Sequence, residues 1–269
     1  FAERMRSLDD ALARMGLTYP FILKPDLGQR GAGIKLIRTR EQAEDYLLEM
    51  TAPLIAQRYA AGPGEAGIFY FRFPHETSGQ IFAMTEKIFR VLLGDGHSTV
   101  EELIQRDARA AIIADKYLHR FASRRTEVLA AGAELKLVEA GNHAQGCIFR
   151  DGQRLGTPAL VARMDEISQR LDGFFIGRYD VRFASEEELR AGSNFQIIEL
   201  NGAASEATSI YDAQYSLGQA YRTLFRQWEL VYAIGAENRA RGVAPTSFAA
   251  VWQAWRHYAA LATRYPAAD

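Results

Sequence analysis

The sequence predicts an α+β protein in which antiparallel strand pairs are combined with amphipathic helices. Pairs of apolar strands follow one another along the chain and are joined by polar loops, as in antiparallel hairpins. Before, between and after these pairs, apolar residues recur at helical spacing and capping residues mark helix starts. Hairpins combined with separate helical segments are typical of α+β folds.

The predicted elements follow a definite order. Helical periodicity and capping patterns predict helices over residues 3–16, 39–50, 108–121, 158–171, 212–241 and 248–262. A further helix is predicted to start at about residue 98. Apolar runs bounded by turn residues predict strands over 19–25, 33–37, 52–60, 67–73, 79–92, 174–184 and 195–201, with a strand and a polar loop within 133–149. The segment 195–201 is expected to be a buried strand.

Local signals mark several boundaries. Thr39 with Gln42, and Ser98 with Glu101, are spaced as capping boxes. The segment "SEEELRAGSN" (185–194) is expected to be an acidic hairpin loop between the last two strands. Three C-terminal aromatic residues at helical spacing indicate either core packing or a partner surface: Trp252, Trp255 and Tyr258.

Composition excludes some function classes. The 269 residues are 48% hydrophobic and 24% charged, with a net charge of −1, which gives no reason to expect a nucleic-acid or anionic-membrane partner. No apolar run approaches a membrane span. A single cysteine, Cys147, rules out an internal disulfide framework and favours inert packing and a reducing, cytoplasmic location.

Oxygen-bearing side chains gather in the last predicted strand pair. In "GRYDVRF" (177–183) apolar and polar residues alternate, so Asp180 points away from the core. In "FQIIELN" (195–201), Glu199 and Asn201 are two residues apart and share a face. Antiparallel pairing would bring Asp180, Glu199 and Asn201 together as hard oxygen ligands that suit Mg²⁺. A solvated strand end with a chance acidic pair is the alternative.

A lysine precedes a glycine-rich loop near the N-terminus. Lys24 ends an apolar strand, and Pro25 terminates it. The loop "DLGQRGAG" (26–33) can bring backbone N–H groups close to phosphates, although an exposed lysine beside an ordinary loop is the alternative. It is not a Walker A loop, because Ile34 stands where the lysine of that motif belongs.

The order of these motifs resembles the ATP-grasp superfamily, in its D-alanine–D-alanine ligase and cyanophycin-synthetase branches. The resemblance covers about residues 17–210 and is most specific in "FILKPDLGQRGAG" and "GRYDVRF…FQIIELNG", with "GDGHSTVEELI" as a further match. It implies an ATP-grasp fold of two α+β subdomains that clasp ATP, followed by C-terminal helices. The implied domains are a small lid subdomain (1–60), a large subdomain (61–211) and a helical segment (212–269).

The resemblance implies a role for each matching residue. Lys24 would contact the α/β-phosphates, and Asp180, Glu199 and Asn201 would hold two Mg²⁺ ions, which Mn²⁺ could replace. Arg178 would stabilise the transferring phosphoryl group. The flap would be formed by Gly28, Arg30, Gly31 and Gly33. Adenine, ribose and phosphate contacts would come from Gln57, Arg58, Tyr59, Glu65 and Lys87; a surface strand lysine is the alternative for Lys87.

Substrate contacts are implied as well. Asn142 would lie near the acyl-phosphate site, and His143 would touch substrate unless it is a bystander. Arg72 would face the same cavity. Ser205 and Glu206 follow the metal asparagine, where related ligases contact substrate. One departure is Gln57, which stands where a glutamate is common.

The implied activity is an ATP-dependent carboxylate–amine ligase that forms an acyl phosphate and releases ADP. The alternatives are a non-ligating ATP-binding regulatory module and a phosphotransferase on the same fold. The expected partners are a small carboxylate and an amine, amino-acid-like or peptide-like. Because the chain starts at Phe1, we expect it to be a piece of a longer protein, in which a fused upstream domain would complete the acceptor site. A homo-oligomer is the other expected kind of partner.

Overall fold

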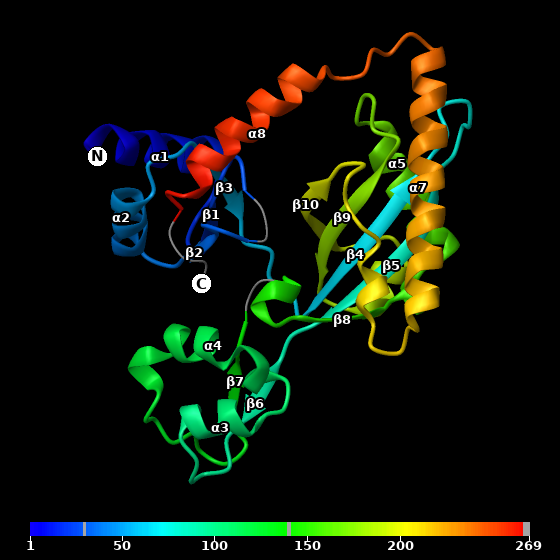
Figure 1. The fold of residues 1–269 in the computed structure, drawn as a ribbon. Coiled ribbons are helices and arrows are strands. Elements are labelled where there is room, and N and C mark those ends of the chain that lie inside the picture. The colour runs from blue at the N-terminus through cyan, green and yellow to red at the C-terminus, as the bar shows by residue number, and fades with distance from the viewer. Residues whose placement is uncertain (29–30, 139–140, 266–269) are drawn as a thin grey trace. The chain divides into compact units, whose positions relative to one another are not determined.

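The computed structural model describes residues 1–28, 31–138 and 141–265 and confirms the predicted α+β class (Figure 1). The chain divides into two compact units. Unit 1 comprises Phe1–Tyr59, Leu118–Ala122 and Thr246–Asp269, and unit 2 comprises Ala60–Tyr117 and Ser123–Pro245. The proposed domains 1–60, 61–211 and 212–269 stay a prediction.

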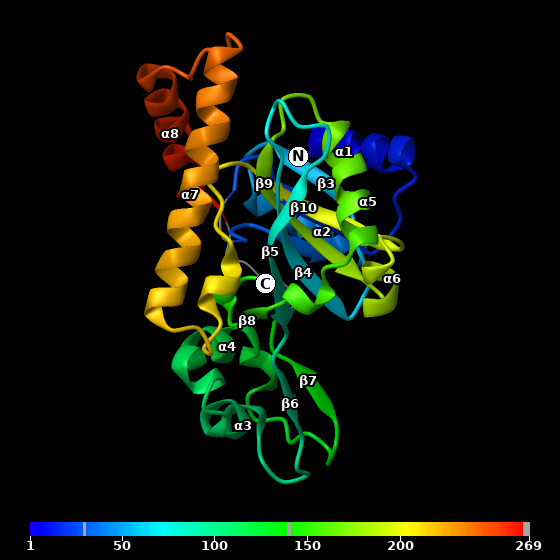
Figure 2. The same ribbon diagram turned by 90° about the vertical axis from the view of Figure 1, so that its right-hand side faces the viewer.

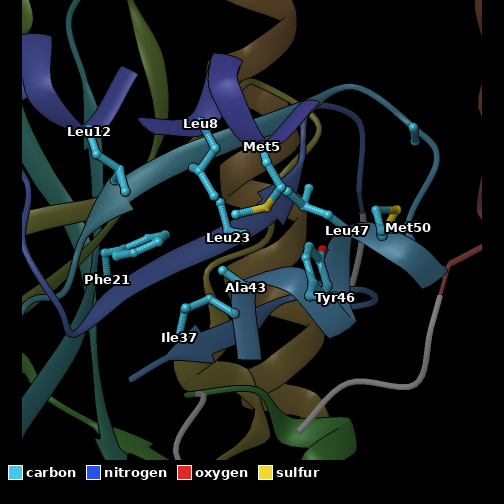
Figure 3. Packing of buried hydrophobic residues seen from close by; sticks show 11 residues of the cluster. Met5, Leu8, Leu12, Phe21, Leu23, Ile37, Ala43, Tyr46, Leu47 and Met50 are labelled. Atoms are coloured by element: carbon cyan, nitrogen blue, oxygen red, sulfur yellow. The ribbon is translucent and has the colours of Figure 1, made fainter. Parts of the chain in front are cut away.

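Unit 1 is built on a three-stranded antiparallel sheet in the order β2–β1–β3. The strands are β1 (Phe21–Pro25), β2 (Lys35–Ile37) and β3 (Leu54–Arg58). Alternate residues of β1 are buried, which turns one face of the sheet toward α1 (Ala2–Met15) and α2 (Arg40–Glu49). Figure 3 shows the resulting core, in which Met5 and Leu8 from α1 meet Leu23 from β1 and Leu47 from α2. The last helix, α8 (Phe248–Ala262), contacts this core through Leu261.

Unit 2 is built on a five-stranded antiparallel sheet in the order β10–β9–β4–β5–β8. The strands are β4 (Gly64–Phe71), β5 (Gln80–Ile88), β8 (Ile148–Asp151), β9 (Ile176–Phe183) and β10 (Phe195–Asn201). One face packs against α5 (Pro158–Gln169) and α6 (Glu186–Arg190). Figure 2 shows α5 and α7 (Leu217–Ala240) on opposite sides of this sheet.

A small lobe of unit 2 connects β5 with β8. It contains the hairpin of β6 (Val91–Leu93) and β7 (Glu134–Lys136), together with α3 (Val100–Arg106) and the first part of α4 (Ala114–Arg120), whose residues from Leu118 onward belong to unit 1. Short 3-10 turns complete the two units: η1 (Ala110–Ile113), η2 (Ala122–Arg124), η3 (His143–Gln145), η4 (Gln153–Leu155) and η5 (Thr208–Tyr211). Among the helices of the described residues, none combines the length and hydropathy needed to cross a membrane.

Three local expectations were wrong. The capping box of α3 consists of Thr99 and Glu102, because Ser98 is engaged by Asp95 through both its backbone N–H and its hydroxyl, at 2.6 Å each. The acidic segment after β9 is not a hairpin loop but contains α6, since Ser185 caps it and three glutamates occupy its first turn, where negative charge stabilises a helix. Strand β10 is not buried. It lies at the sheet edge, with Ile197 and Leu200 36% and 43% exposed.

The expectation for Cys147 is confirmed. Its side chain is fully buried, and burial raises the pKa of the thiol to about 12. A thiol with such a pKa is inert, so Cys147 serves packing.

Candidate active site

The sheet of unit 2 has a second face that carries charged side chains, called here the site face. Antiparallel pairing places Glu65 of β4 opposite both Lys87 of β5 and Arg182 of β9. Lys87 Nζ lies 2.9 Å from Glu65 Oε1 and 3.2 Å from Asp180 Oδ2, and Arg182 Nε donates to Glu65 Oε2 at 2.9 Å. All four residues are buried, with exposed fractions of 2–8%. Because buried charges are stable only when paired, these side chains hold one another in place.

A β-bulge brings Glu199 to this face. Ile197 pairs with Val181 on the core face, and the next pairing is Glu199 with Asp180, so Ile198 is the extra residue. In a regular strand that includes Ile198, Glu199 would share the face of Ile197, since residues two apart point the same way. The bulge therefore places Glu199 opposite Asp180, and Asn201 opposite Arg178, on the site face.

The two carboxylates affect each other's protonation. Burial and then the negative charge of Asp180 raise the pKa of Glu199, and the two carboxyl groups share a hydrogen bond. Burial would also raise the pKa of Asp180, but the cationic Lys87 and Arg178 hold it below its usual value. For Lys87, the carboxylates of Asp180 and Glu65 outweigh burial and raise the pKa. Glu199 is thus the carboxyl group that binds a proton most readily here.

This donor set suits a divalent cation. A cation between Glu199 and Asp180 would replace the proton that relieves their repulsion. Among the described residues, the Asn201 side-chain nitrogen is buried and has no hydrogen-bond partner, so its amide group can reorient and present its oxygen. Within the described residues, no cluster of three or more His, Cys, Asp or Glu side chains is placed to hold a metal ion. Two carboxylates and one amide would leave further positions for phosphate oxygens or water, as Mg²⁺ prefers.

Arg178 is positioned by several elements. Its Nε lies 3.1 Å from Asp180 Oδ1, and its Nη1 donates to the Glu206 carbonyl oxygen at 3.0 Å. Gly67 of β4 lies opposite Asp180, and a Cβ there would be 3.3 Å from Arg178 Cδ. A larger residue at position 67 would therefore press on the guanidinium stem.

The loop before β8 covers part of the site face. A Cβ on Gly141 would lie 1.9 Å from Glu65 Oε1, so only glycine allows this approach. Asn142 follows directly and uses its side chain to cap η3, accepting from Ala144 N at 2.8 Å. His143 stacks on Tyr211 with ring centroids 5.5 Å apart, and burial lowers its pKa. The predicted Asn142 loop is thus at the site.

The loop after β10 is held from α7. Gln227 is fully buried, accepts from Ala207 N and donates to the Ser205 carbonyl, both at 2.8 Å. Glu206 lies between them and accepts from Tyr211 Oη at 2.7 Å through its carboxylate. Ser205 and Glu206 therefore lie beside Arg178, on a loop with a fixed backbone.

Arg72 is placed elsewhere. It follows β4, and its guanidinium lies 4.9 Å from the centroid of the Phe175 ring and donates to the Glu76 carbonyl at 3.2 Å. These neighbours are at the end of the strand away from Glu65, so Arg72 is not brought to the Asp180 cluster.

The remaining predicted residues belong to unit 1. Lys24 pairs with Ile55, and Ile22 pairs with Gln57, so Lys24 and Gln57 share the sheet face turned away from α1 and α2. Arg58 pairs with Phe21 and belongs to the opposite face, and Tyr59 follows the strand.

The flap is anchored at its far end. Tyr46 Oη donates to the Gly33 carbonyl at 2.5 Å, and positive φ angles at Gly31 and Gly33 require glycine. Gly28 is exposed, and Arg30 lies outside the described residues.

Several site residues were missed by sequence reasoning. Arg182 was assigned to the polar face but given no role, and Thr85, Thr208, Tyr211 and Gln227 were not considered. Thr208 Oγ1 lies 2.9 Å from Thr85 Oγ1, which ties η5 to β5. Thr85 and Gln227 are polar residues within otherwise apolar stretches, and this pattern could have marked them as candidates. Their partners Thr208 and Ala207 are 123 and 20 residues away, so the sequence does not show what they bind.

The sequence is similar to those of known ligases. The sequence is 36% identical to a cyanophycin synthetase from Geminocystis herdmanii over 104 residues, and 29% identical to one from a Nostoc species over 169 residues. These matches cover 36% and 60% of this chain. The resemblance to the ATP-grasp ligases is confirmed. No protein-family model matches the sequence.

The ATP-grasp relatives are much longer than this chain. It spans 11% of the first relative and 18% of the second. Among solved structures, a bifunctional glutathione synthetase from Pasteurella multocida aligns over 82% of this chain and 32% of its own length, with 15% identity and a TM-score of 0.42. The sequence matches associate this chain with the ATP-grasp ligases.

Proposed function

We propose that this chain carries the ATP-binding and ligation site of a carboxylate–amine ligase that works through an acyl phosphate. The observation that carries the proposal is the Glu199–Asp180 pair beside Arg178 and Lys87, on one face of a rigid sheet. Its chemistry suits a magnesium-bound triphosphate. The ATP-grasp resemblance supports the same conclusion.

The proposed reaction has two steps. A substrate carboxylate oxygen attacks the γ-phosphorus of ATP, the bond to the β–γ bridging oxygen breaks, and ADP leaves. An amine then attacks the acyl carbon, loses a proton, and inorganic phosphate leaves. Bound Mg²⁺ would neutralise phosphate charge during the first step.

The residues of this chain supply orientation and charge rather than a nucleophile. Asp180, Glu199 and Asn201 would hold the metal. Arg178 would face the transferring phosphoryl group, with its guanidinium aimed by Asp180 and the Glu206 carbonyl.

Two earlier role assignments are refined in this proposal. The Glu65 carboxylate is occupied by Lys87 and Arg182, so we assign it to orienting Lys87; its contact with ribose stays a prediction. The alternative for Lys87, a surface lysine, is wrong, because the side chain is buried. Lys24, Gly28, Gly31 and Gly33, with Gln57 and Tyr59, stay as proposed nucleotide contacts on the strength of the resemblance.

An ADP-release screen tests the proposed function. The full chain is incubated with Mg·ATP and with amino acids, short peptides and small carboxylates, each with and without an added amine. Carboxylate-dependent ADP release that rises with the amine, together with an amide product, is the expected result. ATP binding without turnover would indicate a regulatory module instead. Phosphate transfer to a hydroxyl with no need for an amine would indicate a phosphotransferase.

A further inference from the structure

The helix α7 carries an exposed aromatic stripe, defined by Tyr221, Phe225, Trp228 and Tyr232. Their exposed fractions are 53%, 69%, 41% and 69%. The opposite side of the same helix is buried against the sheet through Gln227, Leu230 and Ile234. Contiguous exposed apolar side chains on this scale are typical of an interface rather than of a solvated helix.

The stripe has the spacing of a coiled-coil seam. Phe225 and Tyr232 are seven residues apart, as are Tyr221 and Trp228, and the two sets alternate as positions a and d of a heptad. Gly218 and Gly235 continue this pattern at its two ends. A Cβ on Gly218 would meet nothing within 4 Å, so the seam is open there. A groove of about 420 Å³ lies along it, lined by Gly218, Tyr221, Arg222, Phe225, Arg226 and Glu229.

The pattern also reads the same in both directions. Steps of four, three and four residues separate the aromatic residues, and the glycines flank them symmetrically. A two-fold axis between Arg226 and Gln227 would set Tyr221 of one copy level with Tyr232 of the other. It would likewise set Phe225 level with Trp228, and Gly218 level with Gly235. An interface between identical copies requires such self-complementarity.

Charge supports the same antiparallel pairing. Arg222 and Glu229 occupy equivalent e positions, which face one another across an antiparallel seam. Glu229 is 64% exposed and lies 2.9 Å from Arg226, and Arg222 makes no ion pair within the described residues. In the symmetric arrangement, Arg222 of each copy would approach Glu229 of the other, giving two opposite-charge pairs.

We propose that α7 is the interface of a two-fold symmetric homodimer, in which the aromatic stripes of two copies pack antiparallel. Aromatic side chains bury roughly 150–250 Å² each, so four half-exposed ones offer on the order of 400 Å² per copy. That is about half the area per partner of a standard stable interface, so we expect a weaker dimer and design the experiment for a dissociation constant on the order of micromolar.

Sedimentation velocity on the full chain over a concentration series tests the dimer. We expect a monomer–dimer equilibrium at up to about 100 μM, well above a micromolar dissociation constant. Phe225→Glu and Trp228→Glu should each raise that constant by at least about 30-fold, as expected for interface hot spots. The matched control is Ile112→Glu, because Ile112 is 70% exposed on η1, and this variant should dimerise normally. A wild-type chain that stays monomeric throughout, or equal effects of all three variants, would overturn the proposal.

Charge and orientation are tested separately. Arg222→Glu should weaken the dimer at least about tenfold, and adding Glu229→Arg should restore it.

Residues 221 and 232 are about 16 Å apart along one helix. Under oxidation, Tyr221→Cys with Tyr232→Cys should therefore cross-link an antiparallel dimer, whereas Tyr221→Cys alone should not. Cross-linking of the single variant would indicate a parallel pair and contradict the proposed symmetry. Cys147 is buried and does not compete.

Discussion

At the scale of single residues, the protonation of Glu199 determines whether the site can bind a divalent cation. It shares a hydrogen bond with Asp180, and it is the partner whose pKa is raised. We predict that Glu199→Gln abolishes ADP release and weakens Mg·ATP binding at least about 100-fold, the upper end of losses when groups around a metal are removed. Calorimetric titration and the ADP assay measure both effects. The control is Glu134→Gln, the same change at an exposed residue of β7. Normal turnover by Glu199→Gln would refute the metal assignment.

The raised pKa of Glu199 also predicts a pH dependence. A carboxyl group whose pKa is raised by folding stabilises the folded state at pH values below its unfolded pKa, near 4.5. This stabilisation is lost as the pH rises through the pKa of the group in the folded state. Mg²⁺ needs the deprotonated form, so its stabilising effect should grow over the same rise in pH. Thermal unfolding with and without Mg²⁺, from pH 4.5 upward, measures this. An equal Mg²⁺ effect at every pH, or the same profile in Glu199→Gln, would contradict it.

Gln227 shows how one buried amide orders a loop. Its side chain satisfies Ala207 N and the Ser205 carbonyl, and both would be left without partners in Gln227→Leu. Unsatisfied buried groups cost about 1–3 kcal/mol each, so we predict a loss of unfolding free energy of roughly that size or somewhat more. Chemical denaturation measures it, with the exposed Gln214→Leu as control. A change within about 0.5 kcal/mol, the range of ordinary surface substitutions, would show that the loop is held by other contacts.

At the scale of elements, the β-bulge in β10 decides which face Glu199 occupies. Deleting Ile197 and Ile198 together should remove the bulge and leave Gln196 opposite Arg182 and Glu199 opposite Val181, which turns Glu199 to the core face. Because β10 is an edge strand, we expect unit 2 to remain folded while Mg²⁺-dependent stabilisation is lost. Circular dichroism and thermal melting with Mg²⁺ measure the two effects. Deleting Ile198 alone leaves Glu199 opposite Asp180 and should keep the response to Mg²⁺. An unaffected double deletion would show that the face of Glu199 is not needed.

Helix ends show where element prediction succeeds and where it fails. Thr39 caps α2 as predicted, because its hydroxyl accepts from Gln42 N three residues away. The predicted capping box is incomplete, since the Gln42 side chain accepts from Arg38 N and not from Thr39 N. The start of α3 was predicted one residue early, since Ser98 and Thr99 both satisfy the cap preference in sequence. The Asp95 side chain decides between them by binding Ser98. Adjacent residues that both favour N-cap positions are thus distinguished only by their neighbours.

At the scale of the whole molecule, two units each have a core of their own. If the chain binds ATP as proposed, ligand at about 100 times its dissociation constant should stabilise the fold by ~2.7 kcal/mol. Differential scanning fluorimetry with Mg·ATP measures this, and Glu199→Gln should reduce the shift. No change in melting temperature at millimolar Mg·ATP would argue against a nucleotide site.

The sequence by itself determined the features that depend on neighbours along the chain. Periodicity located the strands and long helices, and alternation placed Asp180 on a polar face, because these properties extend over a few residues. Only the tertiary structure decided the bulge at Ile198, the pairing of Glu65 with Lys87 and Arg182, and the position of Arg72 away from the cluster. These depend on strand register and on contacts such as Arg182 with Glu65, 117 residues apart, whose energies no local pattern records.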